Sequence, residues 1–221
     1  MNSTTPFHAL ADGVHAATVG GDVVFLSLAD DRYFCLPSGG RRLVLSDLRA
    51  SIATEEAALL EDLRRMALLQ ATGTRAASPQ PDPPLLPVKD LDDGPEVGFG
   101  VSDVPMALRC LRDALLRYRG RSLAHLIVQA RRTPRPIGLT PALIAEVRRY
   151  RRVARWLPIP RKCLLQSFLL LLHLRRCGHD AAWVFATRTW PFEAHCWLQV
   201  EDLVLDDRHE RLVAFTPLLV V

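Results

Sequence analysis

The sequence predicts an α+β protein of two domains, and three observations support this. Residues 1–77 combine three short strand-like segments with helical ones. Residues 98–221 begin with amphipathic helices, continue with a leucine-rich helix and end in strand-like segments. Between the two, residues 78–97 hold six of the 16 prolines, which is typical of a semi-rigid, extended linker.

The first domain is predicted to open with a small sheet, and helices follow. Its strands are expected at residues 16–19, 22–28 and 33–36, because these β-branched and aromatic runs are separated by Gly- and Asp-containing turns. A helix is expected at 41–48. A second is expected at 54–69, with Thr54 as the N-cap and acidic residues in the first turn.

Helices dominate the first part of the second domain. Apolar spacing predicts them at 105–118, 123–130 and 140–154, and Thr140 and Pro141 suit the start of the third. The many arginines of this third helix are expected to form a solvated face or, alternatively, to dock on an acidic surface. Strands are expected at 181–185, 195–200 and 203–207.

The leucine-rich helix is predicted to begin at Cys163. Pro158 and Pro160 keep the approach extended and prevent an earlier start, and Gly178 ends the helix. A helix N-terminus and a protonated histidine both lower the pKa of a thiol, and His195 heads a later strand. This order indicates a cysteine nucleophile, against the common alternative of a small apolar core residue.

A carboxylate on the strand after His195 would orient the imidazole, and two candidates stand side by side. A strict two-residue turn at Glu201-Asp202 places Asp206 on the face of His195 and turns Asp207 away. One extra turn residue or a bulge would instead bring Asp207 onto the face of His195. Spacing within the hairpin therefore leaves both candidates open.

The order of Cys163, His195 and Asp207 resembles a transglutaminase-like or papain-like cysteine protease core. The intervals of 32 and 12 residues resemble the B proteins, the maturation proteases of lasso-peptide biosynthesis. Their His-Ala-Trp-Val-Glu-Val and Val-Leu-Asn-Asp stretches correspond here to residues 195–200 and 204–207, with Cys196 for alanine and Asp206 for asparagine. The resemblance selects Asp207, and with it a bulge or three-residue turn is expected.

The first domain resembles the winged-helix-like leader-recognition domain of ribosomal-peptide maturation systems. Its Tyr33-Phe34-Cys35-Leu36 stretch matches that family's Tyr-Phe-x-Leu pattern. In the family, an extended leader peptide adds a strand to the sheet edge, so these four residues are expected to bind the leader. The implied architecture is a small N-terminal winged-helix-like leader-recognition domain plus a C-terminal transglutaminase-like (papain-like) cysteine protease domain.

The resemblance implies a leader peptidase that binds a ribosomally made precursor and hydrolyses the leader–core bond. Cys163 would attack the carbonyl, His195 would transfer protons and Asp207 would orient His195. An ATP-dependent, asparagine-synthetase-like lasso cyclase is the implied partner, and no cofactor is expected. Two alternatives are a transglutaminase-type acyl transferase and a catalytically inactive peptide-binding module.

Charge and composition exclude several other classes. Residues 1–100 carry a net charge of −6, which disfavours DNA binding by the first domain, and residues 101–160 carry +10. No signal segment opens the sequence, and residues 164–174 are too few to span a bilayer. Five scattered cysteines favour a reducing cytoplasm. No Cys-x-x-Cys or His-x-x-x-His pair occurs, so no metal site is predicted.

Overall fold

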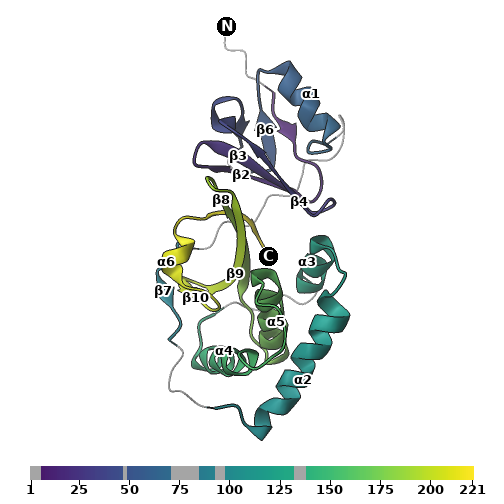
Figure 1. Cartoon of the computed structure of the whole chain (residues 1–221). Coiled ribbons are helices and arrows are strands. Elements are labelled where there is room, and N and C mark those ends of the chain that lie inside the picture. Colours follow the sequence, from purple (N-terminus) through teal and green to yellow (C-terminus); the bar gives the residue numbers. More distant parts are fainter. Residues whose placement is uncertain (1–5, 47–48, 71–84, 93–97, 132–137) are drawn as a thin grey trace. The chain divides into compact units, whose positions relative to one another are not determined.

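The computed structural model describes residues 6–46, 49–70, 85–92, 98–131 and 138–221. The chain forms two compact units (Figure 1). The first unit consists of residues 1–82, 186–194 and 215–220. The second consists of residues 83–185, 195–214 and 221.

Among the described residues of the N-terminal segment, two small sheets and one α-helix form most of the first unit. One sheet has the order β2-β3-β4, from β2 (Val14–Val19), β3 (Asp22–Ser27) and β4 (Arg32–Leu36). The other has the order β1-β6-β5, from β1 (His8–Ala9), β6 (Ser51–Ala53) and β5 (Val44–Leu45). Helix α1 (Ala57–Arg65) completes the unit, and Phe25, Ile52 and Leu63 are buried in its core. The three predicted strands are thereby confirmed.

The two helices predicted in this unit need correction. The described part of the predicted 41–48 helix, residues 41–46, is not α-helical, because a 3₁₀ turn, η1 (Gly39–Arg41), leads into β5, whose partner is β6. Residues 47–48 themselves fall outside the described ranges. The second helix starts at Ala57 rather than Thr54, because the Thr54 hydroxyl donates a hydrogen bond to the Arg42 carbonyl at 2.7 Å. A hairpin with β6 and a hydrogen bond across that hairpin thus overrode the helical propensity of both segments.

The helices of the second unit follow the apolar spacing of the sequence. They are η2 (Val101–Asp103), α2 (Val104–Asp113), a π-helical segment η3 (Ala114–Tyr118), α3 (Leu123–Arg131), α4 (Pro141–Ala154) and α5 (Cys163–Arg176). Thr140 caps α4, because its side chain accepts a hydrogen bond from the Leu143 amide at 3.1 Å. The starts predicted for α4 and α5 are confirmed. Within the described ranges, no helix has both the length and the apolar character needed to cross a membrane.

A five-stranded sheet has the order β11-β8-β9-β10-β7. Its strands are β8 (Ala182–Arg188), β9 (Glu193–Val200), β10 (Leu203–Val204), β11 (Thr216–Val220) and β7 (Lys89–Asp90), and helix α6 (His209–Leu212) precedes β11. The strands predicted at 181–185 and 195–200 are confirmed, whereas the third ends at Val204.

Strand β7 belongs to the segment predicted as a linker. Residues 78–84 and 93–97 of that segment are not among those the structure describes. Within the described part, 85–92, Lys89 and Asp90 pair in parallel with β10, and the amides of Val88 and Lys89 donate to the Asp202 carbonyl. An edge strand offers unpaired backbone groups, so an extended proline-bearing segment can add to it.

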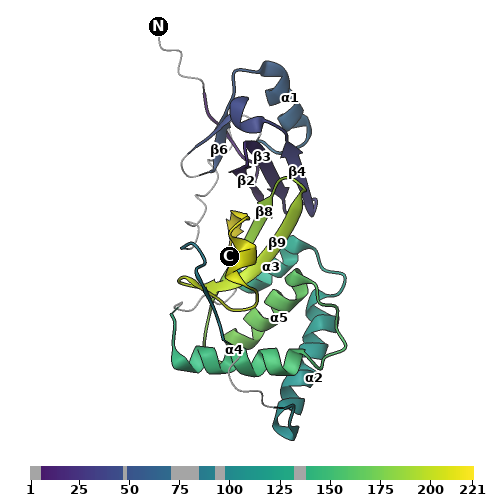
Figure 2. The ribbon, with the colours of Figure 1, turned by 60° about the vertical axis from the view of Figure 1, so that its left-hand side comes forward.

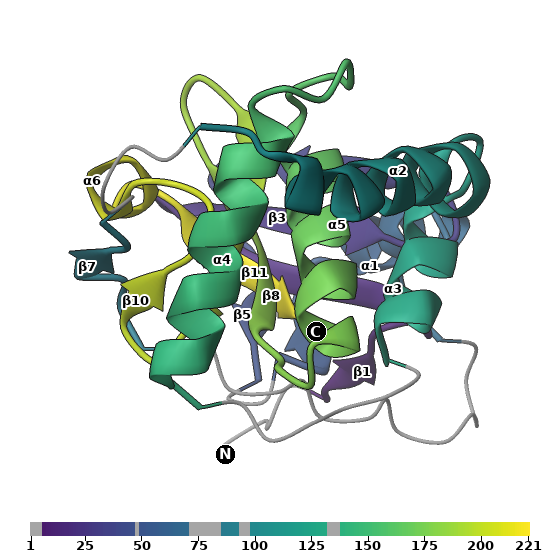
Figure 3. The ribbon, with the colours of Figure 1, turned by 90° about the horizontal axis from the view of Figure 1, so that it is seen from below.

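Helix α5 lies at the centre of the second unit. It contacts α2, α3 and α4, and Figures 2 and 3 show it surrounded by these helices. Its other side meets the sheet, where the rings of Phe168 and Trp183 lie 5.8 Å apart. Leu165 and every residue from 167 to 174 are buried, which explains why the run is apolar all round.

The arginines of α4 are not the solvated face that the sequence predicted. Arg149 and Arg152 bind the carboxylate of Asp103, which is only 1% exposed. Arg151 donates to the carbonyl oxygens of Leu91 and Leu205 at 2.8 and 2.9 Å. These contacts join α4 to the segments that precede α2 and follow β10.

The burial of α5 predicts that its leucines dominate the stability of the second unit. Leu171→Ala should lower the free energy of unfolding by about 2–5 kcal/mol, because the side chain is fully buried. The same substitution at Leu116, which is 65% exposed, should cost less than about 0.5 kcal/mol. Urea unfolding of both variants measures this, and equal losses would contradict the assigned packing.

Candidate active site

Cys163 stands at the first turn of α5, where the sequence predicted it. Lys162, the N-cap residue, has extended backbone angles and provides no side-chain cap. The Gln166 side chain donates to the Pro160 carbonyl at 3.1 Å and so ties the proline-rich approach to the first turn. Cys163 is half-buried, so its sulfur combines a helix N-terminus with partial access to solvent.

His195 on β9 and Asp207 beyond β10 form a direct pair. The Nε2 atom of His195 lies 2.5 Å from Oδ2 of Asp207, and the imidazole is largely buried. The other oxygen of Asp207 accepts a hydrogen bond from the Arg208 amide at 2.8 Å. Because Nε2 is occupied by the carboxylate, Nδ1 is left to face Cys163.

Cys163 and His195 form a thiolate–imidazolium pair at neutral pH. Hydrogen bonds from the Cys196 thiol and from His195 lower the pKa of Cys163 to about 4, against the opposing effect of burial. Burial lowers the pKa of His195, but hydrogen bonds to Asp207 and Cys163 outweigh this and raise it to about 9. Such a pair supplies an activated nucleophile together with an acid.

The path of the chain after β10 explains how Asp207 reaches His195. The hairpin is regular, since Leu203 pairs with Val200 across the turn, and the predicted bulge or three-residue turn is wrong. The strand ends at Val204, and the chain then bends. The strict alternation of side chains therefore no longer applies at Asp207.

Asp206 has a different environment from its neighbour. Its Oδ1 accepts a hydrogen bond from the Leu198 amide of β9 at 2.8 Å. Burial raises the pKa of Asp206 to about 7, whereas burial of Asp207 is outweighed by its bond to His195, which holds that pKa below the usual range. The Asp206 side chain thus accepts the hydrogen bond that a backbone carbonyl would accept if the strand continued, and this stabilises the bend.

A polar network behind Cys163 was not found from the sequence. The Ser167 hydroxyl donates to the Cys163 carbonyl at 2.7 Å and accepts from the Trp183 indole N–H at 2.9 Å. The sulfur of Cys196 lies 3.4 Å from the same hydroxyl, and both are buried. A serine within a leucine run was the one signal for this contact, because a buried hydroxyl requires partners.

Cys196 points away from His195 along the strand, as expected, but it also contacts Cys163. Side-chain alternation predicts that it points away from His195, and the His195 ring does stack on Trp197, two residues along the strand. Both Cys196 and His195 nevertheless hydrogen-bond to Cys163, and the Cys196 backbone amide does so as well. Three groups of β9 therefore hydrogen-bond to the Cys163 sulfur: the Cys196 thiol, the Cys196 amide and the His195 ring.

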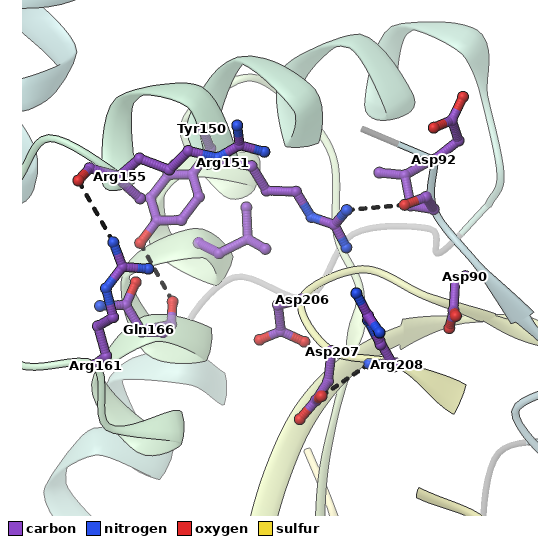
Figure 4. Close-up of a pocket in the computed structure, with 13 residues that line it drawn as sticks. Asp90, Asp92, Tyr150, Arg151, Arg155, Arg161, Gln166, Asp206, Asp207 and Arg208 are labelled. Carbon is purple, nitrogen blue, oxygen red and sulfur yellow. Dashed lines mark hydrogen bonds between the residues drawn. The ribbon is translucent and has the colours of Figure 1, made fainter. Parts of the chain in front are cut away.

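A cavity of about 550 Å³ opens beside Asp207 (Figure 4). Asp206 points into it from below, and Arg151 of α4 lies above it in this view. The Tyr150 hydroxyl donates to the Gln166 carbonyl of α5 at 3.3 Å. The lining is rich in both charges, with Asp90, Asp92, Asp206, Asp207, Arg151, Arg155, Arg161 and Arg208. Such a lining favours polar ligand groups over apolar ones.

The residues predicted to bind a leader, Tyr33, Phe34, Cys35 and Leu36, all lie on β4 of the first unit. Phe34 and Leu36 pack against that unit's core, so Tyr33 and Cys35 face the opposite side of the sheet. Strand β4 is the last strand in the order β2-β3-β4.

The thiolate–imidazolium pair predicts an unusual alkylation profile. The rate of Cys163 modification by iodoacetamide should be constant between about pH 5 and 8 and fall below about pH 4, since only the thiolate reacts. His195→Ala should move this fall to higher pH. Cys110, whose pKa burial raises to about 11, is the internal control, and a Cys163 rate that rises tenfold from pH 6 to 8 would contradict the pair.

Comparison with known protein families agrees with this architecture. Residues 107–220 match the Transglutaminase-like superfamily, and this segment includes Cys163, His195 and Asp207. No curated protein and no solved structure matches the chain significantly. The match covers slightly more than half of the sequence. The chain therefore belongs to the transglutaminase-like superfamily, whose members are typically cysteine-dependent enzymes of the protease or acyltransferase type.

Proposed function

We propose that this protein is a leader peptidase of lasso-peptide maturation, which binds a ribosomally made precursor and hydrolyses its leader–core bond. The observation that carries the proposal is the continuous chain of hydrogen bonds from Cys163 through His195 to Asp207. It lies within the superfamily match. The resemblance of residues 195–200 and 204–207 to the B-protein motifs favours a lasso-peptide precursor as the substrate.

In this mechanism the Cys163 thiolate attacks the scissile carbonyl directly, because its proton is already on His195. The imidazolium then donates that proton to the leaving amine, and a thioester with the leader remains. A water molecule, deprotonated by His195, hydrolyses the thioester. Asp207 keeps the imidazole oriented throughout, and its charge stabilises the protonated form.

The first turn of α5 offers a site for the negative charge that develops on the carbonyl oxygen. The first amides of a helix have no partner within the helix, and Lys162 provides no side-chain cap. The backbone N–H of Cys163 is therefore the candidate donor. The charged cavity beside Asp207 can take polar groups of the peptide near the scissile bond.

Leader recognition is assigned to the first unit, as a winged-helix-like domain whose edge strand β4 pairs with the leader. The side of β4 that carries Tyr33 also holds Phe192, whose ring lies 5.7 Å away and is 38% exposed. A strand at the end of the described sheet order, beside a partly exposed aromatic pair, suits an extended peptide, since backbone bonds give affinity and apolar contacts give specificity.

The released core would pass to a separate ATP-dependent, asparagine-synthetase-like lasso cyclase, and we assign no cofactor to the peptidase itself. Superfamily membership also favours a second candidate, an acyl transferase in which an amine replaces water. An inactive binding module is disfavoured, since the nucleophile, base and carboxylate are all in contact.

Removing the nucleophile tests the proposal. Cys163→Ala should abolish leader removal while the affinity for the precursor changes less than about threefold, because recognition is assigned to β4. Mass spectrometry of the incubated precursor measures cleavage, and fluorescence anisotropy of a labelled precursor measures binding.

Product analysis separates the two candidate reactions. Wild-type protein incubated with precursor and a primary amine should yield free leader and core. A leader joined to the amine would assign acyl transfer instead, and cleavage by Cys163→Ala at the wild-type rate would remove Cys163 from the mechanism.

The two adjacent aspartates provide a matched pair. Asp207→Asn should lower kcat/KM for leader removal roughly 100-fold or more, because the orienting charge on His195 is lost. Asp206→Asn should cost less than about threefold, because an asparagine oxygen can still accept the Leu198 amide. Steady-state kinetics measures both, and the opposite ranking would assign the orienting role to Asp206.

A further inference from the structure

Three potential metal ligands meet at the end of α5 opposite Cys163. His173 and Cys177 are four residues apart, which places them on one face of the helical backbone. Glu146 reaches them from α4, which runs beside α5 in Figure 3. Their ligand atoms all lie within 4.8 Å of one another.

The separations fit a tetrahedral zinc ion. Nε2 of His173 is 2.9 Å from Oε2 of Glu146, and Sγ of Cys177 is 3.6 Å from that oxygen and 3.8 Å from that nitrogen. With zinc–ligand bonds of about 2.0–2.3 Å, a tetrahedral ion separates its donor atoms by roughly 3.3–3.6 Å. Only the nitrogen–oxygen edge must open, by a few tenths of an ångström.

The surroundings hold the ligands in place. The His173 ring is buried and stacks on Tyr150, with ring centroids 5.8 Å apart. The Cys177 amide donates to the carbonyl oxygens of His173 and Leu174, so the helix end is fixed. A site whose ligands are already placed has less conformational entropy to lose on binding.

The donor set and the nearby charges favour a soft divalent cation. A mixture of nitrogen, oxygen and sulfur suits zinc, whereas magnesium and calcium take oxygen ligands. Arg149 and Arg176 lie nearby, but their guanidinium groups are engaged by the buried carboxylates of Asp103 and Asp113. The thiolate and carboxylate together balance the charge of the ion.

We propose that Glu146, His173 and Cys177 bind one zinc ion, with a fourth position open to solvent at the exposed Cys177. The ion would join α4 to the C-terminal turn of α5. At 1.5 Å per residue the site lies about 15–20 Å along the helix from Cys163, so an ion there takes no part in the peptide cleavage proposed above, and the two proposals are independent. Zinc would stabilise the helix that carries the nucleophile.

Cobalt binding to the full chain tests the site. The Cys163→Ala variant is the parent protein, because the catalytic thiol and His195 can themselves bind metal. One equivalent of Co²⁺ should produce visible bands of four-coordinate intensity and a near-ultraviolet thiolate charge-transfer band. Excess Zn²⁺ should displace the cobalt and raise the melting temperature by several degrees.

Three substitutions in that parent decide the assignment. Cys177→Ser should remove the charge-transfer band and the zinc-induced rise in melting temperature, without unfolding the protein, because Cys177 is exposed. Glu146→Gln should weaken Co²⁺ binding at least tenfold, and Glu61→Gln, at an exposed position of α1, should leave the Co²⁺ affinity and the charge-transfer band unchanged. A charge-transfer band that survives Cys177→Ser, or no band in the parent, would overturn the proposal.

Discussion

The hydrogen bonding of Cys163 to strand β9 is the contact on which the rest of the candidate active site depends. The Cys196 thiol, the Cys196 amide and His195 all hydrogen-bond to this sulfur and lower its pKa, in addition to the effect of the helix N-terminus. That arrangement requires the first turn of α5 to keep a fixed position relative to strand β9. The leucines of α5 supply the packing, and the Ser167 hydroxyl, bonded to Trp183 and to the Cys163 carbonyl, fixes the register.

The two neighbouring aspartates show how local backbone geometry divides roles between identical side chains. Asp206 completes the hydrogen bonding of β9 where the ladder stops, and burial raises its pKa. The bend that follows carries Asp207 to His195, whose positive charge keeps this second carboxylate ionised. The contact between His195 and Asp207 thus depends on a strand that ends at Val204, before the two aspartates.

Helix α5 has distinct chemistry at its two ends. Its N-terminus stabilises negative charge on the Cys163 sulfur, and its buried middle holds Cys163 rigidly in place. Its C-terminal turn carries the proposed zinc ligands and meets α4, whose arginines hold the segments around Asp103, Leu91 and Leu205. An ion at that turn would reinforce a helix already fixed on its other sides.

Local signals in the sequence determined where Cys163 stands, because two prolines, a leucine run and Gly178 act on adjacent residues. The strands that carry His195 and the β2-β3-β4 sheet were equally predictable from alternation and turns. Only the structure decided that Val44 and Leu45 pair with β6, that Cys196 bonds to Cys163, and that Glu146 meets His173. The last two contacts join residues distant in the chain, whereas the first is a hairpin that the sequence analysis had interpreted as a helix. Side-chain alternation also gave the wrong face for Asp207, because alternation holds only within a strand and this strand ends at Val204.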